Sequence, residues 1–176
     1  MIELKCDDAR VVGAMLQFMY TFEYDSSDTE ISPMLFHVRV YSIAEKYDVS
    51  ALKLESKNKF NAVVSTCWDM EDFSHVISEI YGSTPPEDRG LRDIVVEVAH
   101  AHIVALLKKD GFNNALQETL GFAADVAQLL AKTTKKYKCQ HSNCGNHWQA
   151  VLSPGGTYHC IHCGHYRSDW ENHVEH

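Results

Sequence analysis

Four of the six cysteines stand in two close pairs near the end of the sequence, and this pattern constrains the fold more than any other feature. Four residues separate Cys139 from Cys144, and two residues separate Cys160 from Cys163, with fifteen residues between the pairs. A glycine follows each pair, which suits a tight turn with a positive φ. Thiolates are preferred ligands of Zn²⁺, which accepts four of them tetrahedrally. The sequence therefore predicts one structural zinc ion per chain, bound by all four cysteines.

The interval between the two pairs predicts a small β structure. An apolar stretch from Trp148 to Val151 is followed by the turn residues 154–156 and then by Tyr158, which indicates a strand, a turn and a strand. The whole segment resembles a zinc ribbon. Some forty residues bury too little apolar surface to fold unaided, so a bound metal would supply the missing stability.

The residues near the cysteines leave alternatives open. His141 or His162 could replace one cysteine as a ligand, and four thiolates could also hold an iron–sulfur centre. A redox-active pair at Cys160 is disfavoured because no thioredoxin-like pattern surrounds it. A catalytic zinc is disfavoured because four cysteines fill the coordination shell and leave no position for water.

Composition divides the chain near residue 133. Residues 1–132 hold 21 acidic and 12 basic side chains, a formal net charge of −9, whereas residues 133–176 carry +1. The second part also holds seven of the eleven histidines. This contrast predicts two structural units, joined by a polar linker over residues 132–136.

The first part predicts a succession of six amphipathic helices. Asp7 or Asp8 would cap the first, Ser32 with Pro33 the second, and Asp48 or Ser50 the third. Residues 2–5 alternate as in a short strand, and Gly111 is expected to end a long fifth helix that starts near Asp88. The apolar periodicity predicts helices over residues 11–22, 33–47, 50–64, 73–81, 88–109 and 116–130. The expected fold class is mainly α, a helical array followed by a small β zinc ribbon.

Several segments of the helical part occur in a recognisable order. They are Ile2-Glu3-Leu4 with Asp7-Asp8, Met15 to Thr21 with Glu23-Tyr24, His37 to Tyr41, Ala44 to Val49, Leu52-Lys53, Ile80-Tyr81 with Thr84-Pro85, and Arg89 to Asp93. This order resembles the second half of a BTB (POZ) domain of the fungal type, followed by the helical extension common in such proteins. The resemblance implies a partial BTB region over residues 1–66, a helical extension over 67–132, and the linker with the zinc-ribbon-like module over 133–176.

The resemblance also implies protein partners. BTB domains commonly act as adaptors, and some link a substrate receptor to a cullin scaffold of a ubiquitin ligase. A BTB domain normally begins with strands and a helix that precede the matching part, and these supply much of the dimer surface. We therefore expect a truncated form of the domain, for which the usual homodimer does not follow.

No sequence motif indicates catalysis. The sequence has no glycine-rich phosphate loop and no nucleophile motif, so we expect a protein that is not an enzyme. It has no long apolar run and no signal peptide, so we expect no membrane association and an intracellular location, in the cytoplasm or nucleus. The alternative is a transcription-associated or nucleic-acid-binding factor acting through the ribbon, which the acidic net charge of −8 disfavours.

Overall fold

The structure, a computed structural model of the 176-residue chain, describes residues 8–26, 31–153 and 155–175. The chain divides into two compact units, Met1–Val126 and Ala127–His176. The first unit is helical, and the second holds the strands and the clustered cysteines. The prediction of a mainly helical chain with a small β region at its C-terminal end is therefore confirmed. The strand predicted over residues 2–5 lies outside the described residues.

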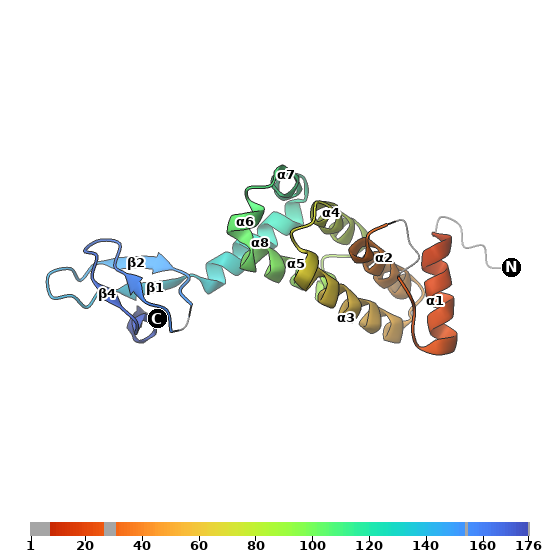
Figure 1. The fold of residues 1–176 in the computed structure, drawn as a ribbon, viewed down its shortest axis with the longest axis horizontal. Helices are drawn as coiled ribbons and strands as arrows, with labels where there is room; N and C mark the ends of the chain where they lie inside the picture. The colour runs from red at the N-terminus through yellow and green to blue at the C-terminus, as the bar shows by residue number, and fades with distance from the viewer. Residues whose placement is uncertain (1–7, 27–30, 154, 176) are drawn as a thin grey trace. The chain divides into compact units, whose positions relative to one another are not determined.

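Eight α-helices occupy the described part of the chain ahead of the first strand (Figure 1). None of the described helices is both long enough and apolar enough to cross a membrane. The helices are α1 Ala9–Thr21, α2 Pro33–Lys46, α3 Ser50–Cys67, α4 Phe73–Ser83, α5 Arg89–Ala101, α6 Ile103–Leu106, α7 Asp110–Glu118 and α8 Leu120–Thr133.

Two of the expected helix caps are present. The Asp8 side chain accepts a hydrogen bond from the backbone N–H of Arg10 at 2.9 Å, and the Ser32 hydroxyl accepts one from the N–H of Leu35 at 3.2 Å. These bonds satisfy backbone donors that the first turn of a helix leaves without partners. The prediction that Asp48 or Ser50 caps α3 is wrong, because its N-cap is Val49 and no side chain bonds to its first turn.

Helix α2 is the centre of the helical unit and packs against α1, α3 and α4 (Figure 1). Side chains on most sides of α2 are buried, and apolar residues accordingly occupy most of the circumference of this helix. One part of the core joins α1, α2 and α3 through buried side chains. These are Val11, Ala14, Met15, Phe18, Tyr24, Phe36, Val40, Ile43, Ala44 and Leu52.

The long helix predicted over residues 88–109 is broken. His102 ends α5 with φ −116° and ψ 17°, and the short α6 begins at the next residue. The ring of His102 lies parallel to the ring of Trp68, with their centroids 3.8 Å apart. This contact joins residues far apart in the sequence, so the periodicity around His102 could not reveal it.

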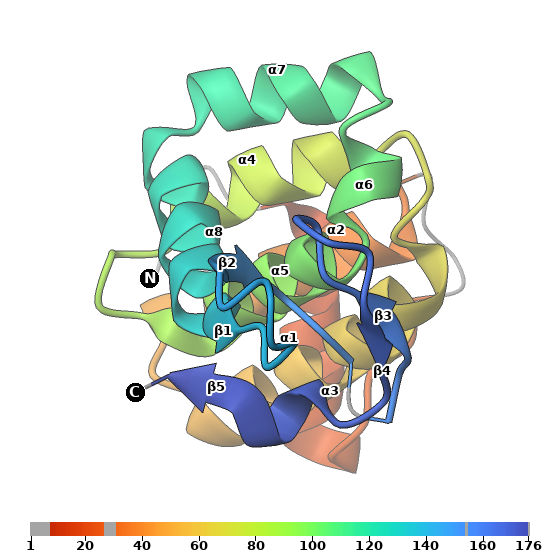
Figure 2. The ribbon, with the colours of Figure 1, turned by 90° about the vertical axis from the view of Figure 1, so that its left-hand side faces the viewer.

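Two glycines near the starts of helices allow close packing, and one of them, Gly111, does not end a helix as predicted. Gly111 lies in the first turn of α7, and a Cβ atom there would approach the Ser74 hydroxyl oxygen of α4 to 3.1 Å. Gly121 lies inside α8, where a Cβ atom would come within 3.1 Å of the Tyr81 ring. Figure 2 shows α7 lying along α4. The last helix, predicted over residues 116–130, is broken at Thr119, which follows the end of α7 and precedes the start of α8.

The second unit contains two small antiparallel sheets. In the first, β1 lies between β2 and β5, and in the second β3 pairs with β4. A short 3₁₀ helix, Trp170–His173, precedes β5. The strands are β1 Lys135–Lys138, β2 His147–Ala150, β3 Tyr158–His159, β4 Tyr166–Arg167 and β5 Val174–Glu175.

One prediction for this unit is corrected. The expected polar linker over residues 132–136 is not a linker, because Lys132 belongs to α8 and Lys135 begins β1. The strands predicted on either side of residues 154–156 are present as β2 and β3, and they pair with β1 and β4, respectively. Three of the four residues of β1 are lysines, and only Tyr137 is buried. A strand with a single apolar residue shows little alternation of apolar and polar positions, so the sequence pattern did not predict it.

Candidate metal centre

The first cysteine pair sits on a tight loop between β1 and β2. The backbone N–H of Cys144 donates to the carbonyl of His141 at 2.9 Å, and the N–H of Cys139 donates to the carbonyl of Asn146 at 3.0 Å. Gly145 follows with φ 59°, in the left-handed region that glycine enters without steric cost. The loop therefore turns back on itself and brings both cysteines to its inner side.

The second pair repeats this arrangement between β3 and β4. The N–H of Cys160 donates to the carbonyl of His165 at 2.8 Å, and the N–H of Gly164 donates to the carbonyl of Cys160 at 2.9 Å. Gly164 has φ 71°. The prediction that a glycine with positive φ follows each pair is confirmed at both loops.

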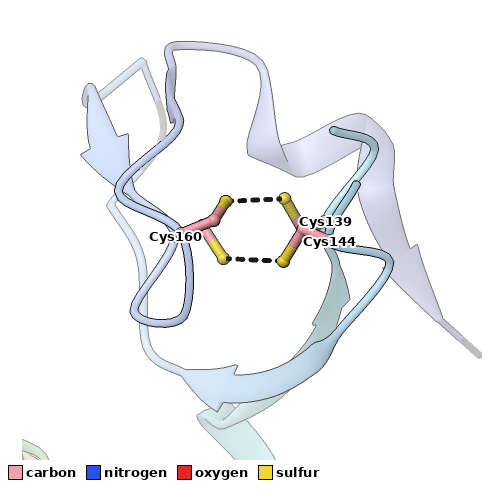
Figure 3. A group of neighbouring side chains, drawn as sticks. Cys139, Cys144 and Cys160 are labelled. Atoms are coloured by element: carbon pink, nitrogen blue, oxygen red, sulfur yellow. Dashed lines mark hydrogen bonds between the residues drawn. The ribbon is translucent and has the colours of Figure 1, made fainter. Parts of the chain in front are cut away.

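The two loops bring the four sulfur atoms together. All four Sγ atoms lie within 4.8 Å of one another, and the closest pairs are Cys139 with Cys163 at 3.7 Å and Cys144 with Cys160 at 3.9 Å. Figure 3 shows Cys139 and Cys144 on one side and Cys160 facing them. A tetrahedral ion with metal–sulfur bonds of about 2.3 Å needs sulfur atoms roughly 3.8 Å apart. The cluster matches that spacing, and it is far too wide for a disulfide bond of about 2.05 Å.

The thiols of the cluster differ in burial and acidity. Cys139 and Cys160 are buried, whereas Cys163 is exposed. Burial raises the pKa of Cys139 to about 12. Burial also acts to raise the pKa of Cys160. Hydrogen bonds from the backbone N–H groups of His162 and Cys163 outweigh burial, so the pKa of this thiol is lowered to about 7. A bound cation would favour the thiolate form of all four, so metal binding would release protons.

An aromatic core supports the cysteine loops. The Trp148 and Trp170 rings meet edge to face with centroids 5.3 Å apart, and Tyr137 contacts both. The Trp170 indole N–H donates to the Tyr158 carbonyl at 2.8 Å, which ties the 3₁₀ helix to β3. Cys139 and Cys160 belong to the same buried cluster. The contribution of Trp170 and Val174 to this core was not predicted from the sequence, although two large apolar residues four positions apart near the end of the chain were a usable signal.

The neighbouring histidines make other contacts. The Nε2 atom of His162 lies 3.3 Å from the carbonyl oxygen of His147, and the ring of His141 lies 4.9 Å from that of His165. Within the described residues, the group that could hold a metal consists of the four cysteines. The structure therefore brings the four cysteines predicted as ligands together.

Comparisons with protein-family models, with curated proteins and with solved structures find no match to this chain. The BTB resemblance accordingly rests on the sequence motifs alone and stays a prediction.

Proposed function

We propose that the four cysteines bind one structural Zn²⁺ and that the chain is a non-enzymatic protein-interaction module of BTB type, an adaptor to a cullin-type ubiquitin ligase scaffold. The observation that supports the metal site is the gathering of four Sγ atoms within 4.8 Å of one another, and the adaptor role rests on the BTB resemblance of the sequence. A site made of four thiolates is closed, since it leaves no coordination position for water or substrate. Such a site contributes folding free energy rather than catalysis.

Zinc is preferred because of the loops that carry the ligands. Each loop offers two sulfur atoms from a short turn, which is the arrangement of structural zinc sites. Reduced thiols are required, so we place the protein in the cytoplasm or nucleus, where disulfides are rare. An iron–sulfur centre is the competing occupant, and its visible absorption would distinguish it from colourless zinc.

Exposed apolar side chains on the second unit support a role in protein binding. Ile161 lies between the second pair of cysteines and is 70% exposed, and Tyr166 in β4 is 65% exposed. Exposed apolar side chains offer contact area to a partner, and metal binding by the adjacent cysteines would hold them in place. The helical unit would supply the adaptor surface that the BTB resemblance implies.

Elemental analysis of the purified chain tests the metal. We expect one zinc per chain in the wild-type protein and less than a tenth of that in Cys160→Ser, because three thiolates hold the ion more weakly than four. Cys67→Ser is the matched control, since Cys67 lies in α3 outside the cluster. A wild-type chain purified without chelator that carries no metal would refute the site.

Binding to a purified cullin scaffold, measured by calorimetry, tests the adaptor role. We expect saturable binding by the zinc-loaded chain. The absence of binding at about 100 μM would remove the cullin assignment while leaving the zinc site intact. Turnover of a substrate by the purified chain would contradict the proposal that it is not an enzyme.

Nucleic-acid binding is the second candidate, and the exposed lysines of β1 favour it. Lys135, Lys136 and Lys138 are all exposed. Four thiolates and one Zn²⁺ add a formal charge of about −2, which offsets part of this positive surface. Binding to oligonucleotides that weakens steeply with salt would support this role, and no binding at low salt would exclude it.

A further inference from the structure

Two histidine side chains meet beside the cysteine cluster. His141 belongs to the loop that carries the first cysteine pair, and His165 ends the loop that carries the second. Their ring centroids lie 4.9 Å apart, and the ring planes are inclined by 37°. The rings of Trp68 and His102, in contrast, form a true stack, with centroids 3.8 Å apart and an inclination of 8°. The histidine rings are therefore close to each other without being stacked.

The two loops hold these histidines at equivalent positions. His141 stands two residues after Cys139, and its backbone N–H bonds to that sulfur atom. His165 stands two residues after Cys163 and bonds to its sulfur atom in the same way. The two sulfur atoms are themselves 3.7 Å apart. The fold that gathers the cysteines therefore also brings the two histidines together.

The ring nitrogens of this pair are available to a ligand. Another histidine of the second unit, His159, has its Nδ1 atom 3.2 Å from the Gly164 carbonyl oxygen. Within the described residues, neither His141 nor His165 makes a hydrogen bond or an ion pair through its ring. His141 is exposed and His165 is half-buried, so an ion from solution can reach them. Each imidazole offers two nitrogen atoms for such an ion.

We propose that His141 and His165 together bind a second Zn²⁺ ion, beside the ion held by the four cysteines. Imidazole nitrogen is a preferred ligand of Zn²⁺, at about 2.0–2.1 Å. Two imidazoles on one tetrahedral ion place their ring centroids roughly 5 Å apart, and the pair has this spacing. Water would complete the coordination, so this site is open, whereas the cysteine site is closed.

The charge of the cysteine cluster favours a cation at this place. Four thiolates with one Zn²⁺ carry a formal charge of −2, which attracts a second cation nearby. This attraction rests on the structural zinc of the proposed function, whereas the geometry of the histidine pair does not. With two protein ligands instead of four, we expect the second ion to bind more weakly than the first.

Calorimetric titration of the untagged, full chain, purified with its structural ion, tests the proposal. We expect one further equivalent of Zn²⁺ to bind with a dissociation constant on the order of 10 μM. His141→Ala and His165→Ala should each weaken this binding at least tenfold. The double variant should weaken it little further, because both rings hold the same ion and the losses do not add. The imidazole nitrogen signals of both residues should shift together in NMR spectra as zinc is added.

His159→Asn is the matched control, because asparagine keeps a hydrogen-bond donor toward the Gly164 carbonyl and lies outside the pair. It should leave the further equivalent unchanged. Elemental analysis before the titration should give one zinc per chain in the wild type and in every variant, which shows that the cysteine site is intact.

The outcomes separate this proposal from the structural zinc site. A chain that carries one zinc and binds no further equivalent would overturn the histidine site alone. Further binding that the His141 and His165 variants leave unchanged, or that His159→Asn weakens equally, would also overturn it. A chain purified without zinc whose weak binding still requires both histidines would refute the cysteine site and support this one. A chain that binds no zinc in either way would overturn both.

Discussion

Glycines in this chain serve two different physical purposes. Gly145 and Gly164 adopt positive φ values directly after each cysteine pair, where a side chain would strain the turn. Gly111 and Gly121 have ordinary helical geometry, but a Cβ atom at either would press on a neighbouring helix. Sequence spacing identified the first purpose, because the glycines stand at fixed places beside the cysteines. The second purpose depends on which side chain of another helix lies opposite the glycine, and sequence spacing does not reveal that side chain.

Gly164→Ala should weaken metal binding. The left-handed conformation at φ 71° costs an alanine about 1–2 kcal/mol, and the loop closes around the second cysteine pair. We expect the metal affinity, measured by competition with a chromophoric chelator, to fall roughly tenfold. Gly82→Ala is the control, because a Cβ atom there meets nothing within 4 Å. An unchanged affinity in Gly164→Ala would show that the loop relaxes without cost.

A buried histidine should make the helical unit sensitive to mild acid. His37 is 3% exposed, and the Tyr24 hydroxyl oxygen lies 2.8 Å from its Nδ1 atom. Burial, reinforced by the charge of Lys59, lowers the pKa of His37 to about 4 from 6.5. The unfolded chain therefore binds more protons than the folded one between these two values, so stability falls as the pH drops through this range.

Urea unfolding at pH 7 and pH 5 measures this effect. We expect the wild-type chain to lose about 2 kcal/mol of unfolding free energy between the two values through His37. His37→Gln should lose correspondingly less, since glutamine can still accept a hydrogen bond from Tyr24 and does not titrate. Equal losses in both proteins would mean that His37 is protonated without cost in the folded state.

At the scale of helices and strands, the carboxylate of Asp88 joins α5 to α2 and α3. Asp88 caps α5 by accepting from the Gly90 N–H at 3.0 Å, accepts from the Tyr41 hydroxyl at 2.7 Å, and forms an ion pair with Lys53 at 2.9 Å. Burial acts to raise the pKa of Asp88, but the interactions with Lys53 and Tyr41 outweigh it and lower the pKa below 3.8. The sequence predicted that a helix starts near Asp88, but it did not predict the partners of this carboxylate on α2 and α3.

Asp88→Ala should lower the free energy of unfolding by about 2 kcal/mol at neutral pH, because it removes a cap and leaves Tyr41 without its acceptor. Since the folded pKa is depressed, the contribution of Asp88 is present above about pH 4 and is lost as the pH falls further. Asp93→Ala removes an exposed ion pair with Arg89 and should change stability by less than about 0.5 kcal/mol. Chemical unfolding of both variants checks the difference.

At the scale of the whole molecule, the two units are stabilised by different means. The helical unit buries aliphatic and aromatic side chains from several helices, whereas the buried cluster of the second unit centres on three aromatic rings and two cysteines. A unit of about fifty residues with so small a core requires an additional constraint such as a metal.

Removal of the metal should therefore affect one unit only. With excess chelator, we expect the amide signals of residues 137–170 to collapse to the narrow dispersion of an unfolded chain, while the signals of the helical unit keep their positions. Heteronuclear NMR with and without chelator measures both in one sample. Retained dispersion of the 137–170 signals without metal would show that the aromatic core suffices to fold the second unit.

The sequence alone determined the features that depend on local spacing. The cysteine pairs with their glycines, the caps at Asp8 and Ser32, and the mainly helical character of residues 8–133 all follow from residues within a few positions of each other. Such patterns are legible because turn and helix geometry place nearby residues in fixed relation. The tertiary structure decided the remainder. The stacking of His102 on Trp68, the packing role of Gly111 and the pairing of β1 with β5 each depend on a partner distant in the chain, and only the folded chain places that partner in contact.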